Sequence, residues 1–167
     1  MSLRSLSFMM ILSLAVALSG CGSSKKKKAG PDEAITDVPT QENSFELNGD
    51  SDNSKAGGLR TVYFDFNSSQ LSGETRSTLE NNAKFLKDNT SSKIQVEGHC
   101  DERGSIQYNL ALGERRAKAV KEFLVAKGVN SKRISTISFG KERPVDSGHD
   151  EMAWTKNRRG NFVVTAK

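Results

Sequence analysis

Residues 93–124 combine a strand pattern, a polar loop and a helix pattern, and they read KIQVEGHCDERGSIQYNLALGERRAKAVKEFL. Ile94 and Val96 alternate with polar neighbours, which predicts a half-buried strand. A polar loop follows. Apolar or small residues then recur every three or four positions from Ile106 to Leu124, which predicts a long amphipathic helix.

Five further elements are predicted outside this stretch. The β-branched and aromatic run at 61–66 predicts a strand, and Ser72 as N-cap predicts a helix that ends near Lys87. The later elements are a strand at 134–139, a short helix at 151–157 and a strand at 162–165. The order β-α-β-α-β-(α)-β predicts an α/β fold of the α+β-like kind, with a four-stranded mixed sheet and helices packed on one face. Right-handed crossovers predict parallel pairing of the first strands, with the last strand antiparallel.

Composition indicates that part of the chain lies outside any core. Of 167 residues, 35% are hydrophobic and 27% charged, a low apolar share for this length. Two cysteines exclude both a disulfide framework and a four-cysteine zinc site. We expect three parts: a signal peptide at 1–20, a lipidated cysteine with a disordered linker at 21–58, and a folded domain at 59–167.

The N-terminus has the features of an export signal. The apolar run from Phe8 to Leu18 would rise about 16 Å as a helix, too short for a bilayer core of about 30 Å. It ends Leu18-Ser19-Gly20-Cys21, which resembles a bacterial lipobox. Cys21 would then carry the lipid at the start of the mature chain. The alternative is an ordinary export signal cut at Ser19-Gly20, with Cys21 unmodified.

Residues 22–58 show neither helical nor strand periodicity. Their aliphatic residues are isolated, which predicts too little buried apolar surface to offset the entropy of ordering. The lysine run from Lys25 to Lys28 is expected beside anionic lipid head groups; a nucleic-acid or signalling patch and a merely solvated run are the alternatives.

Three polar residues are candidates for a binding site. Asn109 and Arg116 lie on the predicted helix and, at about 100° per residue, fall within about 20° of one face. Asp101 can reach that face from the preceding loop. A carboxylate held apart from a guanidinium suits a zwitterionic ligand, because each binds one pole. The alternative is a structural Asp101–Arg116 salt bridge that caps the helix.

Other candidates are weaker. His99, Cys100 and Asp101 are adjacent, so in an extended chain they chelate a metal poorly even if His149 joins them. Cys100 is expected to be buried. The basic turn at 157–161 lacks interleaved aromatic residues, so we expect no nucleic-acid partner. We also find no Ser-His-Asp arrangement and expect no metal, cofactor or catalytic residue.

Several motifs together resemble the OmpA-like domain family. They are VYFDFN (62–67), VEGHCDERG (96–104), YN (108–109), LGERRA (112–117), FGKERP (139–144), GHDE (148–151) and KNRR (156–159). The resemblance covers nearly all of residues 61–164.

This resemblance implies non-catalytic binding of the peptide stem of peptidoglycan at meso-diaminopimelate. It implies that Asp101 takes the ammonium group, that Arg116 takes the carboxylate, and that Asn109 supports the pocket. The backbone around Phe66 and Asn67 would form a wall.

With the lipobox, the resemblance also implies a place in the cell envelope. It implies a protein anchored by its lipid in the outer membrane, with its domain facing the periplasm, that tethers this membrane to the cell wall. Tol proteins such as TolB would be its partners. A wall hydrolase or amidase, and an assembly component that binds mainly protein, are the competing hypotheses.

Overall fold

The computed structural model describes residues 44–167. Three α-helices, a 3₁₀ helix and four strands occur in an order that confirms the predicted pattern. They are β1 (Val62–Tyr63), α1 (Gly73–Asp88), β2 (Lys93–His99), α2 (Ile106–Ala126), the 3₁₀ helix (Ser131–Arg133), β3 (Ile134–Gly140), α3 (Glu151–Asn157) and β4 (Arg159–Ala166). None of these helices is both long and apolar enough to cross a membrane.

Side-chain caps define where the helices begin. The hydroxyl of Ser72 accepts a hydrogen bond from the N–H of Thr75 at 3.1 Å, which confirms it as the N-cap of α1. Ser105 caps α2 in the same way, and Asp150 caps α3. Each cap satisfies a backbone donor that has no partner inside the helix, so these local residues set the helix starts.

The sheet has the strand order β1-β4-β2-β3. β2 and β3 are parallel, and β4 is antiparallel to both β1 and β2. The predicted parallel pair between the first two strands is therefore wrong, because β4 lies between them. β1 and β2 still run in the same direction, as a right-handed crossover requires. β1 is also shorter than predicted, since the chain leaves β4 after Tyr63.

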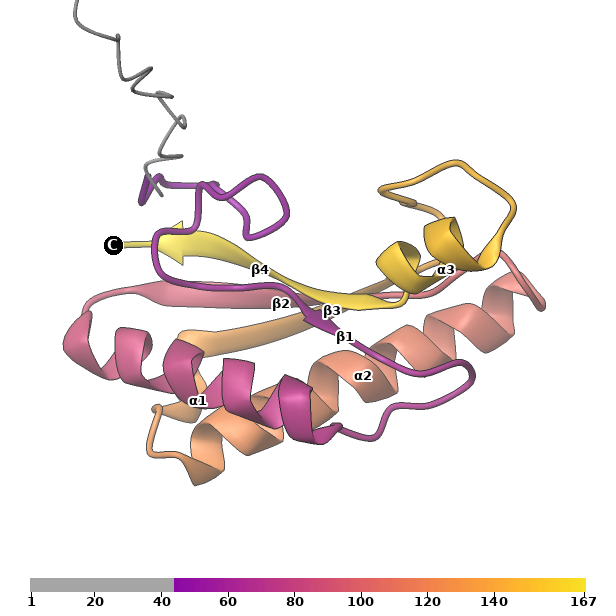
Figure 1. The fold of residues 1–167 in the computed structure, drawn as a ribbon. Coiled ribbons are helices and arrows are strands. Elements are labelled where there is room, and N and C mark those ends of the chain that lie inside the picture. The colour runs from indigo at the N-terminus through magenta and orange to yellow at the C-terminus, as the bar shows by residue number, and fades with distance from the viewer. Residues whose placement is uncertain (1–43) are drawn as a thin grey trace, which may run out of the picture. The chain divides into compact units, whose positions relative to one another are not determined.

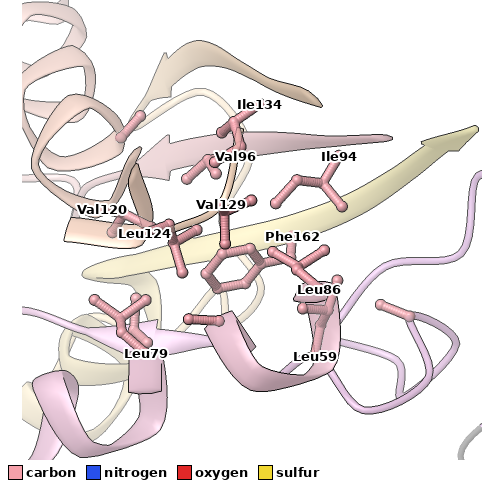
Figure 2. Close-up of a cluster of buried hydrophobic side chains, with 14 of the residues drawn as sticks. Leu59, Leu79, Leu86, Ile94, Val96, Val120, Leu124, Val129, Ile134 and Phe162 are labelled. Atoms are coloured by element: carbon pink, nitrogen blue, oxygen red, sulfur yellow. The ribbon is translucent and has the colours of Figure 1, made fainter. Parts of the chain in front are cut away.

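One hydrophobic core lies between the sheet and the helices α1 and α2, which cover the same face (Figure 1). Figure 2 shows side chains from the sheet and from both helices around Phe162, which is fully buried. The short α3 stands at one end of the sheet, directly before β4 (Figure 1).

Two glycines bring α2 against the sheet. A Cβ atom at Gly98 in β2 would lie 1.9 Å from the carbonyl oxygen of Gly113 in α2. Since no side chain fits in that space, the helix and the strand approach each other more closely here than larger residues would allow. This contact holds the first half of α2 beside the end of β2.

The folded domain begins earlier than predicted. Residues 44–58 were expected to be part of a disordered linker, but they pack on the domain. The N–H of Ser51 donates to the carbonyl of Phe162 at 2.9 Å, and Asp50 forms an antiparallel bridge with Val163. Ala56 is fully buried in the core. Backbone hydrogen bonds to β4 order this segment although it has few hydrophobic residues. Composition alone does not reveal such bonds. The predicted signal peptide, Cys21 and residues 22–43 lie outside the described residues.

Candidate functional site

A pocket of about 170 Å³ lies beside the N-terminal half of α2. The β1–α1 loop and the β2–α2 connection form its sides, and both lie at the end of the sheet that carries α3 (Figure 1). Its lining residues are Phe66, Asn67, Cys100, Asp101, Arg103, Gly104, Tyr108, Asn109, Leu112 and Arg116. All five residues predicted from the sequence as ligand contacts therefore line one pocket.

Arg116 is one of two arginines that line the pocket, and it is fully buried. Its guanidinium donates to three backbone carbonyls: from Nε to Ser68 at 2.8 Å, from Nη1 to His99 at 2.8 Å, and from Nη2 to Asp65 at 3.0 Å. A guanidinium has five N–H groups, so these bonds orient it without using all its donors. Burial lowers the pKa of Arg116 from its usual value.

Within residues 44–167, Arg116 forms no ion pair. The alternative of a structural Asp101–Arg116 salt bridge is therefore wrong. Carbonyl dipoles stabilise the buried cation directly, whereas the Asp101 carboxylate acts on it only through space, without a close ion pair. The pocket thus contains a positive charge that an anionic ligand group can match.

Asp101 is the acidic group, and its side chain is only 4% exposed. Arg103 and Arg158 both form ion pairs with it, at 2.7 Å and 3.3 Å between nitrogen and Oδ2. Burial alone would raise the pKa of the Asp101 carboxyl, but the hydrogen bonds from these arginines hold it below its ordinary value. Asp101 is therefore an ionised carboxylate that already has cationic partners.

Arg103 connects three segments at the mouth of the pocket. Its guanidinium carbon lies 4.0 Å from the centre of the Phe66 ring and 4.1 Å from that of Trp154. Phe66 belongs to the β1–α1 loop and Trp154 to α3. The arginine, which itself follows β2, thus fixes both aromatic side chains next to Asp101.

Asn109 supports the β2–α2 connection. Its Nδ2 donates to the carbonyls of Arg103 at 2.9 Å and Ser105 at 3.1 Å. Asn67 accepts a hydrogen bond from the hydroxyl of Tyr108 and has a positive φ of 55°. These contacts shape the wall formed by the loop.

Sequence reasoning missed Arg103 and Arg158 as parts of the site. Arg103 stands in the quoted loop two residues after Asp101, which is a signal for a local ion pair. Arg158 was seen only as part of a basic turn. In the structure, Arg158 and Arg159 are 6% and 5% exposed, so this turn presents neither guanidinium to solvent.

The two histidines have carboxylate partners outside the pocket, and Cys100 is a buried part of the pocket wall. His99 lies 3.4 Å from Glu97 through Nε2, and His149 lies 2.7 Å from Glu102 through Nδ1. Within residues 44–167, no three metal-ligating side chains come together. Cys100 is buried as expected, and burial raises the pKa of its thiol.

The amino-acid sequence is similar to those of known proteins. Residues 63–158 match the model of the OmpA family. A peptidoglycan-associated lipoprotein of Pseudomonas aeruginosa is 44% identical over 153 residues, which are 89% of each chain. One of Pasteurella multocida is 40% identical over 151 residues, covering 90% of this chain and 92% of the relative.

Solved structures of related proteins have the same fold as this chain. The crystal structure of the peptidoglycan-associated lipoprotein from Burkholderia pseudomallei is 43% identical and has a TM-score of 0.61, over 63% of this chain and 89% of that one. The C-terminal domain of Helicobacter pylori MotB has the same fold, with a TM-score of 0.62 over 66% of this chain and 87% of that one, at 22% identity.

Proposed function

Because this chain belongs to the OmpA family, among the peptidoglycan-associated lipoproteins, we propose that its pocket binds the diaminopimelate-containing peptide stem of peptidoglycan without catalysis. The buried guanidinium of Arg116, which has no carboxylate in close contact within residues 44–167, is the observation that carries this proposal. A ligand carboxylate would supply the charge that the surrounding carbonyls do not.

The other residues of the pocket have supporting roles in this proposal. Asp101 binds the ammonium group of diaminopimelate. Asn109 stabilises the β2–α2 connection, which contains Asp101. The backbone around Phe66 and Asn67 forms the wall on the other side. We expect modest affinity at one site, because the ammonium meets a carboxylate that already has cationic partners, and avidity from many copies on a polymer.

The N-terminal region completes the proposal. A lipid on Cys21 anchors the protein in the outer membrane, and the domain faces the periplasm. Since residues 44–58 pack on the domain, the connection comprises residues 22–43, which reach at most about 75 Å when fully extended. The protein would thereby link the outer membrane to the wall and work with Tol proteins such as TolB.

Sedimentation of the purified protein with isolated cell-wall sacculi tests the proposed function. We expect the native chain to sediment with sacculi without releasing soluble fragments. Arg116→Gln should abolish sedimentation, whereas Arg115→Gln, the same change at an exposed neighbouring position, should not. Circular dichroism controls for folding. Steady release of wall fragments would favour an enzyme instead, and sedimentation of a folded Arg116→Gln variant would refute the assigned pocket.

A further inference from the structure

Every acceptor position of the Asp101 carboxylate is in use. Its Oδ1 accepts from the backbone N–H and from Nε of Arg103, both at 3.2 Å. Its Oδ2 accepts from Nη2 of Arg103 at 2.7 Å and from Nη1 of Arg158 at 3.3 Å. Since a carboxylate offers about four lone-pair sites, an incoming ammonium group must replace one of these donors.

Arg103 is the donor that can give way. The side chain of Arg158 is 7% exposed, and its Nη2 also binds Glu151 at 2.7 Å. The side chain of Arg103 is 30% exposed and lines the pocket. Its contacts with Phe66 and Trp154 do not involve Asp101, so they can keep the guanidinium at the pocket mouth after the ion pair opens.

The two charged poles of the pocket therefore differ. Arg116 has no carboxylate partner, so a ligand carboxylate adds a new charge-assisted interaction in a buried place. Asp101 has two guanidinium partners, so a ligand ammonium only exchanges one cation for another. Such an exchange has a small net effect, because the bond that forms resembles the bond that breaks.

From this asymmetry, we propose that Arg103 competes internally with the ligand's ammonium group for Asp101 and makes the pocket select its ligand mainly by the carboxylate. This inference rests on the proposed function, since it concerns the same pocket and ligand. Arg103 is thus a specificity-determining residue. Removing its guanidinium frees two hydrogen-bonding positions on Asp101 and makes binding depend on the ammonium as well.

Calorimetric titration with three forms of one stem peptide tests this proposal. The first probe is L-alanyl-γ-D-glutamyl-meso-diaminopimelate. The second is the same peptide acetylated on the amine of the D-centre of diaminopimelate, and the third is the same peptide amidated on the carboxylate of that D-centre. In the native protein, acetylation should weaken binding less than about threefold and amidation more than about tenfold. In Arg103→Gln, the effect of acetylation should rise to about tenfold, while that of amidation stays unchanged. Arg115→Gln should behave like the native protein.

Comparing the three probes within each protein separates specificity from a general loosening of the pocket, which would weaken all three alike. Should Arg103→Gln fail to fold, Arg103→Lys, which cannot form the two-pronged pair, should still give a larger acetylation effect than the native protein. A tenfold acetylation effect in the native protein, or an equal effect in the native and Arg103 variants, overturns this inference alone. Failure of the native protein to bind any of the peptides overturns the proposed function and this inference with it.

Discussion

Nη1 of Arg158 lies 3.3 Å from Oδ2 of Asp101, although 57 positions separate the two residues in the chain. Arg158 immediately precedes β4, and Asp101 follows β2, so the ion pair joins the ends of two neighbouring antiparallel strands. Both side chains are buried. Through this pair, the position of β4 helps to fix Asp101 in the pocket.

Arg158→Gln should destabilise the protein by about 3 kcal/mol, because it removes one partner from a buried ion pair. Urea unfolding measures the change. Lys156→Gln is the control, since its salt bridge with Asp146 is exposed and should contribute about 1 kcal/mol or less. Equal effects of the two substitutions would contradict the role assigned to Arg158.

Stability should decrease in acid partly through Asp101. Its pKa is held below the ordinary value of 3.8 in the folded protein, so the ionised carboxylate stabilises the fold fully above that value. This contribution is lost as the pH falls through the lower folded-state pKa. The difference in unfolding free energy between native protein and Asp101→Asn should stay constant from about pH 7 to about pH 4 and shrink below that. If the difference in unfolding free energy grows on acidification, the pKa of Asp101 in the folded protein is not lowered.

Gly98→Ala should destabilise the fold by about 2 kcal/mol or more, since its Cβ would lie 1.9 Å from the carbonyl oxygen of Gly113. Thermal unfolding measures the loss. Gly73→Ala is the matched control, because a Cβ there meets nothing within 4 Å. That substitution lies at the start of α1 and should be neutral or slightly stabilising. A neutral Gly98→Ala variant would mean that α2 approaches β2 less closely than described.

Ser51→Ala tests whether residues 44–58 are part of the folded domain. The Ser51 hydroxyl donates to Oδ1 of Asn161 at 2.8 Å and accepts from the N–H of Phe162 at 3.0 Å. Its loss leaves buried groups without these partners and should cost about 1–3 kcal/mol. Ser91→Ala, at an exposed position, should change stability by less than about 0.5 kcal/mol. If both variants are equally stable, the segment does not contribute to the fold.

Cys21→Ala tests the proposed anchor. Without the thiol that would carry the lipid, the protein should move from the membrane fraction to the soluble fraction, while its binding to sacculi in vitro stays unchanged. Cys100→Ala is the control for loss of a cysteine and should leave fractionation unchanged, because this thiol is buried in the domain. Membrane association that persists in a Cys21→Ala protein from which residues 1–20 have been cleaved would rule out lipidation at this position.

Part of the pocket could be predicted before the structure. Asn109 and Arg116 line it together, as their helical spacing predicts, and Asp101 joins them from the loop. Their proposed roles toward a ligand remain predictions. The ion pair of Asp101 with Arg158 could not be predicted, because it depends on the position of β4 beside β2.

The sequence by itself determined the helices and the strands of the core, because N-caps such as Ser72 and the alternation of Ile94 and Val96 act through residues close in the chain. Only the tertiary structure decided that β4 lies between β1 and β2, that residues 44–58 belong to the domain, and that Arg158 pairs with Asp101. Those features arise from contacts between distant residues, such as Ser51 with Asn161 at a separation of 110 positions. Their free energies depend on which surfaces meet, and no local pattern encodes that.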